Sequence, residues 1–122
     1  MNSREVSDRL LDYGVSAIRL VESLPRTLAG RRIGDQLLRS SISVGANYEE
    51  AQAAESRQDF VHKLQIALKE LRESNYWLRL LAKAGIAPGH QLSAILDESG
   101  QLRAMLSKAA ATTKGKATVA EP

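Results

Sequence analysis

The sequence predicts an all-α protein, an antiparallel four-helix bundle with up-down-up-down topology. Apolar residues recur at spacings of three and four along most of the 122-residue chain, the pattern of a helix with one buried stripe. Aromatic residues are scarce, with three Tyr, one Trp and one Phe, so Leu, Ile, Val and Ala must form the core. Pro25, Gly85 and Gly89 interrupt the pattern, and such short connections place successive helices antiparallel.

The first helix is predicted over residues 4–24. It ends before Pro25, because the residue that precedes a proline avoids helical backbone angles. Three further apolar residues, Leu11, Ile18 and Val21, are expected to widen its buried stripe. The stripe itself consists of Val6, Leu10, Tyr13, Ala17, Leu20 and Leu24.

The second helix is predicted over 28–54 and contains an unusual polar position. Its middle, 40–47, is rich in Gly, Ala and Ser, which lets another helix approach closely. Asn47 lies on the predicted stripe, and a buried amide must find hydrogen-bond partners. We therefore interpret Asn47 as a buried polar pin that sets the register of the helices. The predicted stripe is Ile33, Leu37, Ser40, Val44, Asn47, Ala51 and Ala54.

The third helix is expected to begin after Ser56, which acts as an N-cap with Asp59 three residues later. Gly85 supplies the left-handed residue that ends it. Its predicted stripe is Phe60, Leu64, Ala67, Leu71, Ser74, Leu78 and Leu81.

The fourth helix is predicted to start near Pro88. Its inward residues are expected to be Leu92, Ile95, Ser99, Leu102, Leu106 and Ala109. The sequence thus predicts a bundle over 1–110. Residues 111–122 have little to bury and are expected to form a disordered tail.

Short motifs in the second and third helices carry a family resemblance. They are Gln36-Leu37-x-Arg39, Ser43-Val44-Gly45-Ala46-Asn47, Ser56-Arg57-x-x-Phe60, Ile66-Ala67 and Tyr76-Trp77-Leu78. Together they resemble the four-helix-bundle proteins encoded by intervening sequences of 23S rRNA genes. The family is also similar to the accessory proteins of diversity-generating retroelements. The resemblance implies a homopentameric ring, and its retroelement branch implies binding to nucleic acid and to a reverse transcriptase.

A second row on the third helix suggests a subunit interface. It contains Ile66, Glu70, Glu73, Trp77 and Leu80. A single bundle core does not need this row beside the first, and Trp is enriched at interface anchors. We expect the row to pack against another subunit, where the two acids meet arginines from the second helix of that neighbour. In the alternative interpretation, Trp77 lies at the edge of its own core.

A third row on the same helix is basic. It contains no acid over about 30 Å of helix, and consists of His62, Gln65, Lys69, Arg72, Tyr76, Arg79 and Lys83. Cations with an aromatic residue among them suit a phosphate backbone and a stacked base, so RNA or DNA is a candidate partner. A second candidate cluster is Arg26, Arg31, Arg32 and Arg39. Alternatively, these charges only form solvated helix faces.

Several function classes are disfavoured. There is no cysteine, and Asp59-x-x-His62 is the one spacing that resembles a di-iron ligand pair, so we expect no metal, no cofactor and no catalytic site. No apolar run is long enough for a membrane span, and the N-terminus is charged where a signal peptide is apolar, so a cytoplasmic location is expected. Two functions remain: a ring that binds nucleic acid, or a scaffold for a protein partner alone.

Overall fold

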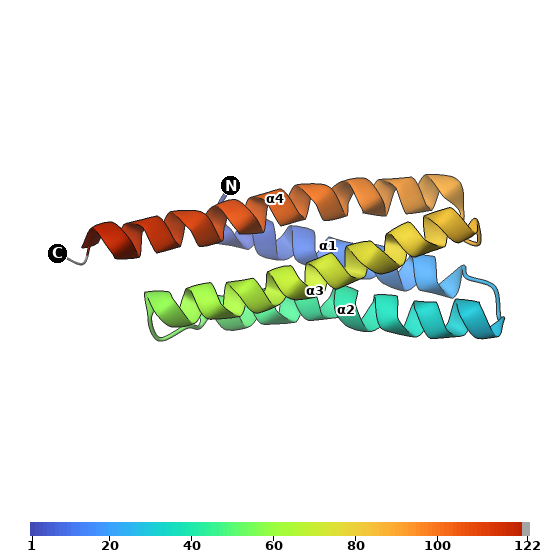
Figure 1. The fold of residues 1–122 in the computed structure, drawn as a ribbon, viewed down its shortest axis with the longest axis horizontal. Coiled ribbons are helices and arrows are strands. Elements are labelled where there is room, and N and C mark those ends of the chain that lie inside the picture. The colour runs from blue at the N-terminus through green and yellow to red at the C-terminus, as the bar shows by residue number, and fades with distance from the viewer. Residues whose placement is uncertain (121–122) are drawn as a thin grey trace.

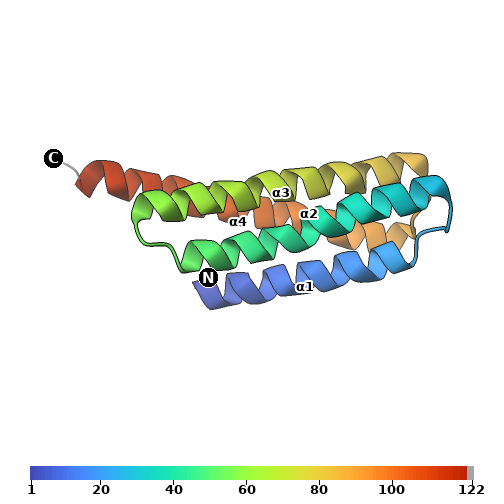
Figure 2. The ribbon, with the colours of Figure 1, turned by 90° about the horizontal axis from the view of Figure 1, so that it is seen from below.

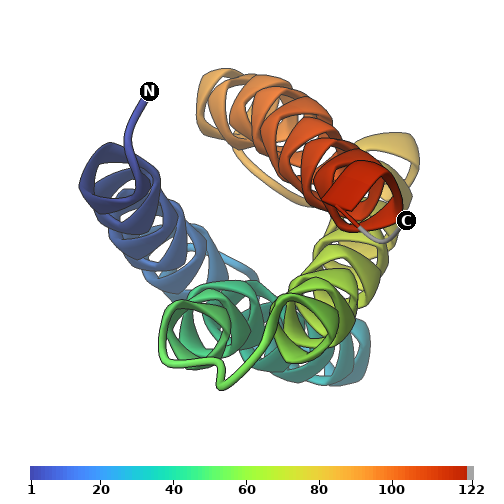
Figure 3. The same ribbon diagram turned by 90° about the vertical axis from the view of Figure 1, so that its left-hand side faces the viewer.

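The computed structural model describes residues 1–120, with side chains through Gly115. This part of the chain forms four helices and no strand: α1 (Ser3–Glu22), α2 (Leu28–Gln52), α3 (Arg57–Ala84) and α4 (Gly89–Ala120). Successive helices run antiparallel (Figures 1 and 2). Each helix packs on its neighbour in sequence, and contacts between α1 and α4 close the bundle (Figure 3). The predicted fold is confirmed.

Local signals fix the helix ends. The side chains of Asn2, Thr27 and Ser56 each accept a hydrogen bond from a backbone N–H three residues on, which satisfies one of the free donors of a first helical turn. Gly85 ends α3 with a φ of 68°, a conformation that favours glycine. The sequence predicted the Ser56 and Gly85 signals and missed the other two caps.

The core consists mainly of leucines from all four helices. The predicted stripes supply most of it, including Leu20, Leu37, Leu71 and Leu102, each fully buried. The predicted widening of the first stripe is wrong in part, because Leu11 is 67% exposed and Ile18 is 42% exposed. The inner side of α1 is already filled by Leu10, Tyr13, Ala17 and Leu20, so the wider row points away from the core.

Small residues of α2 allow α1 to pack closely, as predicted for its middle segment. A Cβ atom on Gly45 would lie 3.6 Å from the Cβ atom of Leu10. One on Gly34 would lie 3.2 Å from Val21 and 3.3 Å from Leu24. The two helices can therefore contact each other almost backbone to backbone.

The C-terminal segment differs from its prediction. Disorder was expected from residue 111, whereas α4 continues to Ala120 and extends past the first turn of α1 (Figure 1). Among the side chains described for α4, Ala110 is the last buried one. The extension adds one backbone hydrogen bond per residue to an existing helix, so it needs no core contact to form. Residues 121 and 122 lie outside the described chain.

Candidate nucleic-acid interface

The basic row of α3 lies fully on the surface. All its members, from His62 to Lys83, are exposed. No salt bridge involves Lys69, Arg72, Arg79 or Lys83 within the described residues. Their charges therefore stay available to an anionic ligand.

Tyr76 stands in the middle of this row and is held in place by its neighbour. Its ring is 55% exposed and meets the Trp77 ring edge-on, with the centroids 5.1 Å apart and an interplanar angle of 77°. Beside it, Arg79, Leu80 and Lys83 line a groove together with Leu96 of α4. An apolar floor with cations at its rim suits a stacked base and its phosphate.

α4 contributes a cation that sequence reasoning missed. Asn75 of α3 donates a hydrogen bond to Ser99 of α4 at 3.1 Å, so Ser99 marks the side of α4 that faces α3. Arg103 follows one turn later on that side and is exposed. The side of α4 on which Arg103 lies follows from the pairing of the two helices, so one-helix patterns could not find it.

The second predicted basic cluster is not one surface. Arg26 and Arg31 line a pocket at the α1–α2 turn together with the acids Glu22 and Asp35. Arg32 is exposed nearby along the chain.

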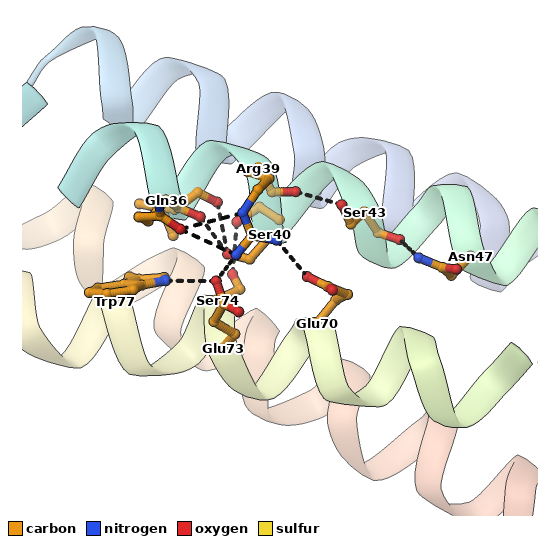
Figure 4. Close-up of polar contacts among 11 residues, drawn as sticks. Gln36, Arg39, Ser40, Ser43, Asn47, Glu70, Glu73, Ser74 and Trp77 are labelled. Atoms are coloured by element: carbon orange, nitrogen blue, oxygen red, sulfur yellow. Dashed lines mark hydrogen bonds and ion pairs between the residues drawn. The ribbon is translucent and has the colours of Figure 1, made fainter. Parts of the chain in front are cut away.

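Arg39 forms ion pairs with two acids of α3. It bonds to Glu70 of α3 at 3.2 Å and also to Glu73 (Figure 4). Its charge is therefore neutralised by the bundle itself, and it is a poor candidate for nucleic-acid contact.

The two acids of the predicted subunit row contact α2 of the same chain. All five members, Ile66, Glu70, Glu73, Trp77 and Leu80, are half-buried. The two acids meet an arginine of the second helix, as expected, but that helix belongs to the same chain. The indole Nε1 of Trp77 donates to Glu73 at 3.1 Å, and its ring packs against the core (Figure 4). These contacts match the alternative interpretation of Trp77 as an edge residue of its own core.

The polar pin prediction is wrong for Asn47. This side chain is half-buried and donates to the backbone oxygen of Ser43 at 2.8 Å, within the same helix (Figure 4). Tyr48 takes the core position instead and is 5% exposed. A straight helix drifts by about 20° per seven residues relative to a strict 4-3 pattern, which moves the buried side by one residue along α2.

A different polar layer is buried at the centre of the bundle. The hydroxyl of Ser74 lies 2.5 Å from that of Tyr13 and 2.7 Å from that of Ser41, which joins α1, α2 and α3. All three residues are almost completely buried. Burial raises the pKa of Tyr13 above its usual value, and the hydrogen bond from Ser74 opposes this rise. The layer has the register-setting geometry that was expected of Asn47.

The possible di-iron ligands have structural explanations. The backbone N–H of Asp59 donates to the Ser56 cap, and its carboxylate accepts from the backbone N–H of Glu55 and lies 3.6 Å from the amine of Lys63. His62 is exposed. Among the described residues, no three His, Cys, Asp or Glu side chains gather as metal ligands would. Nor is any described helix both long and apolar enough to cross a bilayer.

Comparison with known proteins decides the family. Residues 3–108 match the family model of the 23S rRNA-intervening sequence protein. The chain belongs to this family. A crystal structure at 1.70 Å of a protein of unknown function, from the S23 ribosomal protein family of Bacteroides thetaiotaomicron VPI-5482, is similar. It shares 35% sequence identity and a TM-score of 0.83, over 90% of this chain and 98% of that one.

Membership of the 23S rRNA-intervening sequence protein family confirms the predicted resemblance. No curated protein matches the chain. The family match ends at residue 108, close to Ala110, so it covers the packed bundle and leaves the C-terminal extension of α4 outside.

Proposed function

We propose that this chain is a non-enzymatic, self-assembling protein that binds single-stranded nucleic acid through the basic row of α3. One observation carries the proposal: the four cations of the row are exposed along one helix side and have no acidic partner in the described chain. Each neutralised phosphate releases counterions, which drives binding without any base-specific contact.

The contrast with Arg39 supports the assignment. On the adjacent side of α3, two acids engage Arg39 in ion pairs. The cations of the basic row form no salt bridge within the described residues, and the exposed Tyr76 adds a stacking surface. The chain thus separates a neutralised flank from a charged one on the same helix.

Self-assembly would strengthen such binding. The ring of five chains that the family resemblance implies is part of this proposal, and native mass spectrometry is expected to give the mass of five 13.3 kDa chains. Repeating the row around a symmetry axis raises the local positive potential and adds avidity. A reverse transcriptase or another protein can use the same assembly as a platform.

Fluorescence anisotropy with labelled 20-nucleotide RNA and DNA tests the binding. Four phosphate contacts per chain predict that log K falls with log salt concentration with a slope of about −3. The double variant K69E/R79E should lose at least tenfold in affinity. The control R19E/K108E changes the net charge equally at exposed positions on α1 and α4, and should lose less than threefold. Equal losses in the two variants, or a salt-independent affinity, would contradict the proposal.

A second function is favoured by a different surface. The outer side of α1 and α2 exposes several large apolar residues, including Leu11 and Ile42. A scaffold that binds only proteins would need this surface and not the basic row. In that case neither RNA nor DNA binds at low salt, while assembly persists.

A further inference from the structure

The outer face of α1 and α2 is apolar, and no other described part of the chain covers it. Val15 and Ile18 are each 42% exposed, Ile42 is 49% exposed and Leu11 is 67% exposed. They surround a groove whose lining also includes Gly14 and Gly45. Scattered apolar residues are normal on a surface, but a contiguous patch of this kind marks an interaction site.

The α1–α2 face offers one docking row on each helix. The helices lie side by side over most of their length (Figures 2 and 3). Eighteen residues at the helical rise span about 27 Å, and two helices together are about 20 Å wide. A contact between one row on each copy covers about 270 Å² per copy, and a copy that uses both rows buries about 500–600 Å² in two contacts. Each single contact is therefore in the range of weak interfaces, and closure of the assembly has to add to its stability.

The charges at the ends of the face follow a matched pattern. On α1, Arg4, Leu11, Val15, Ile18 and Glu22 share one side at spacings of 7-4-3-4. On α2, the same spacings connect Arg31, Leu38, Ile42, Gly45 and Glu49. Each row therefore has a cation at its N-terminal end and an acid 18 residues later. The residues between them in each row are apolar or small, except for Asp8 and Asp35 in the two seven-residue gaps.

Because α1 and α2 run antiparallel, the two rows are complementary. Arg4 and Glu49 belong to one end of the bundle, and Glu22 and Arg31 belong to the other (Figure 2). All four are exposed, and none forms a salt bridge within the described chain. Glu49 accepts a hydrogen bond from Ser7 in the same chain, which leaves its charge in place.

We infer that the α1 row of one copy docks on the α2 row of a second copy, with both bundles pointing in the same direction. A single register then satisfies both ends, with Arg4 opposite Glu49 and Glu22 opposite Arg31. The same register places Leu11 against Ile42 and Val15 against Leu38.

Two positions fit this register less well. Asp35 falls opposite Ile18, one helical turn from Arg31, which can neutralise it. Gly45 falls opposite Asp8, which lies one helical turn from Arg4. The remaining positions set apolar side chains against each other and opposite charges at both ends.

The inference rests on the self-assembly part of the proposed function. Each copy carries both rows, so the contact can repeat from copy to copy and close by symmetry. The occupant is a second copy because the chain itself supplies a row of matching length, charge order and apolar centre.

Charge reversal with rescue tests the register. Sedimentation velocity at 50 µM is expected to show an assembled wild type. R4E alone and E49R alone should each weaken assembly at least fivefold, because like charges then meet. R4E/E49R should restore most of it. If both single variants assemble like the wild type, or the double variant rescues nothing, the inference is wrong.

An apolar variant and a matched control complete the test. I42D should give monomers with unchanged helical circular dichroism. L28D alters another exposed leucine of α2, 64% exposed and outside the groove, and should assemble normally. A monomeric wild type would assign the face to a different partner and overturn the inference. A wild type that assembles but does not bind RNA would instead contradict only the nucleic-acid part of the proposed function.

Discussion

The hydroxyl of Tyr13 lies 2.5 Å from the hydroxyl of Ser74 in the centre of a core made otherwise mostly of leucine. Ser74 also binds Ser41, so one small side chain connects three helices. A buried polar group needs its hydrogen-bond partner, because without it the desolvation cost of the group is no longer compensated. This layer therefore favours one register of α1, α2 and α3 over shifted packings that an all-leucine core would tolerate.

Removing the shared hydroxyl should destabilise the bundle. S74A deprives Tyr13 and Ser41 of their 2.5 and 2.7 Å partners, and we expect a loss of about 1–3 kcal/mol in the free energy of unfolding. Urea denaturation followed by circular dichroism measures it. The control S93A removes an exposed serine and should stay within about 0.5 kcal/mol. A change in S74A no larger than in S93A would show that the layer contributes nothing.

The same tyrosine predicts a pH dependence. Burial raises the pKa of Tyr13 in the folded state above the unfolded value of about 10. Because the pKa is higher in the folded state, the contribution of Tyr13 to the free energy of unfolding is fully present below about pH 10. It is lost as pH rises through the folded-state pKa. The free energy of unfolding should therefore fall as pH rises above about 10, and less steeply in Y13F. Part of the slope should persist, because burial also raises the pKa of Tyr48. Equal slopes in the wild type and Y13F would contradict a role of Tyr13 in this pH dependence.

Sequence patterns predicted the helices because each one carries a strong period, and Pro25 and Gly85 mark the ends of two of them. They were less successful where two helices must be placed together. The exposed row of Leu11 and Ile18 looked like core, since a periodic pattern cannot tell which side of a broad apolar stripe meets a neighbour. The Asn47 error is a one-residue drift along α2, and the partnership of Arg39 with Glu73 depends on the α2–α3 pairing. The basic row of α3 needed no partner helix, and its exposure was predicted correctly.

Arg39 should matter less for RNA binding than Arg79, although both are arginines of the predicted basic set. Arg39 is held by two carboxylates, whereas Arg79 has no acidic partner in the described part of the chain. R39M should change RNA affinity less than twofold and lower stability by at most about 1 kcal/mol, as for other exposed ion pairs. R79M should reduce affinity three- to tenfold. A larger loss in R39M than in R79M, measured by anisotropy, would reverse our assignment of the binding side.

Two glycines should respond in opposite directions to the same substitution. A Cβ atom on Gly34 would lie 3.2 Å from Val21 and 3.3 Å from Leu24, so both side chains have to shift in a packed helix pair. We expect G34A to lose about 1 kcal/mol or more, because overpacking outweighs the gain in helix propensity. Around Gly100 in α4, a Cβ would meet nothing within 4 Å. G100A should therefore gain about 0.5–1 kcal/mol from helix propensity alone. Urea midpoints of the two variants measure the difference, and a stabilised G34A would mean that α1 and α2 are less closely packed than the structure shows.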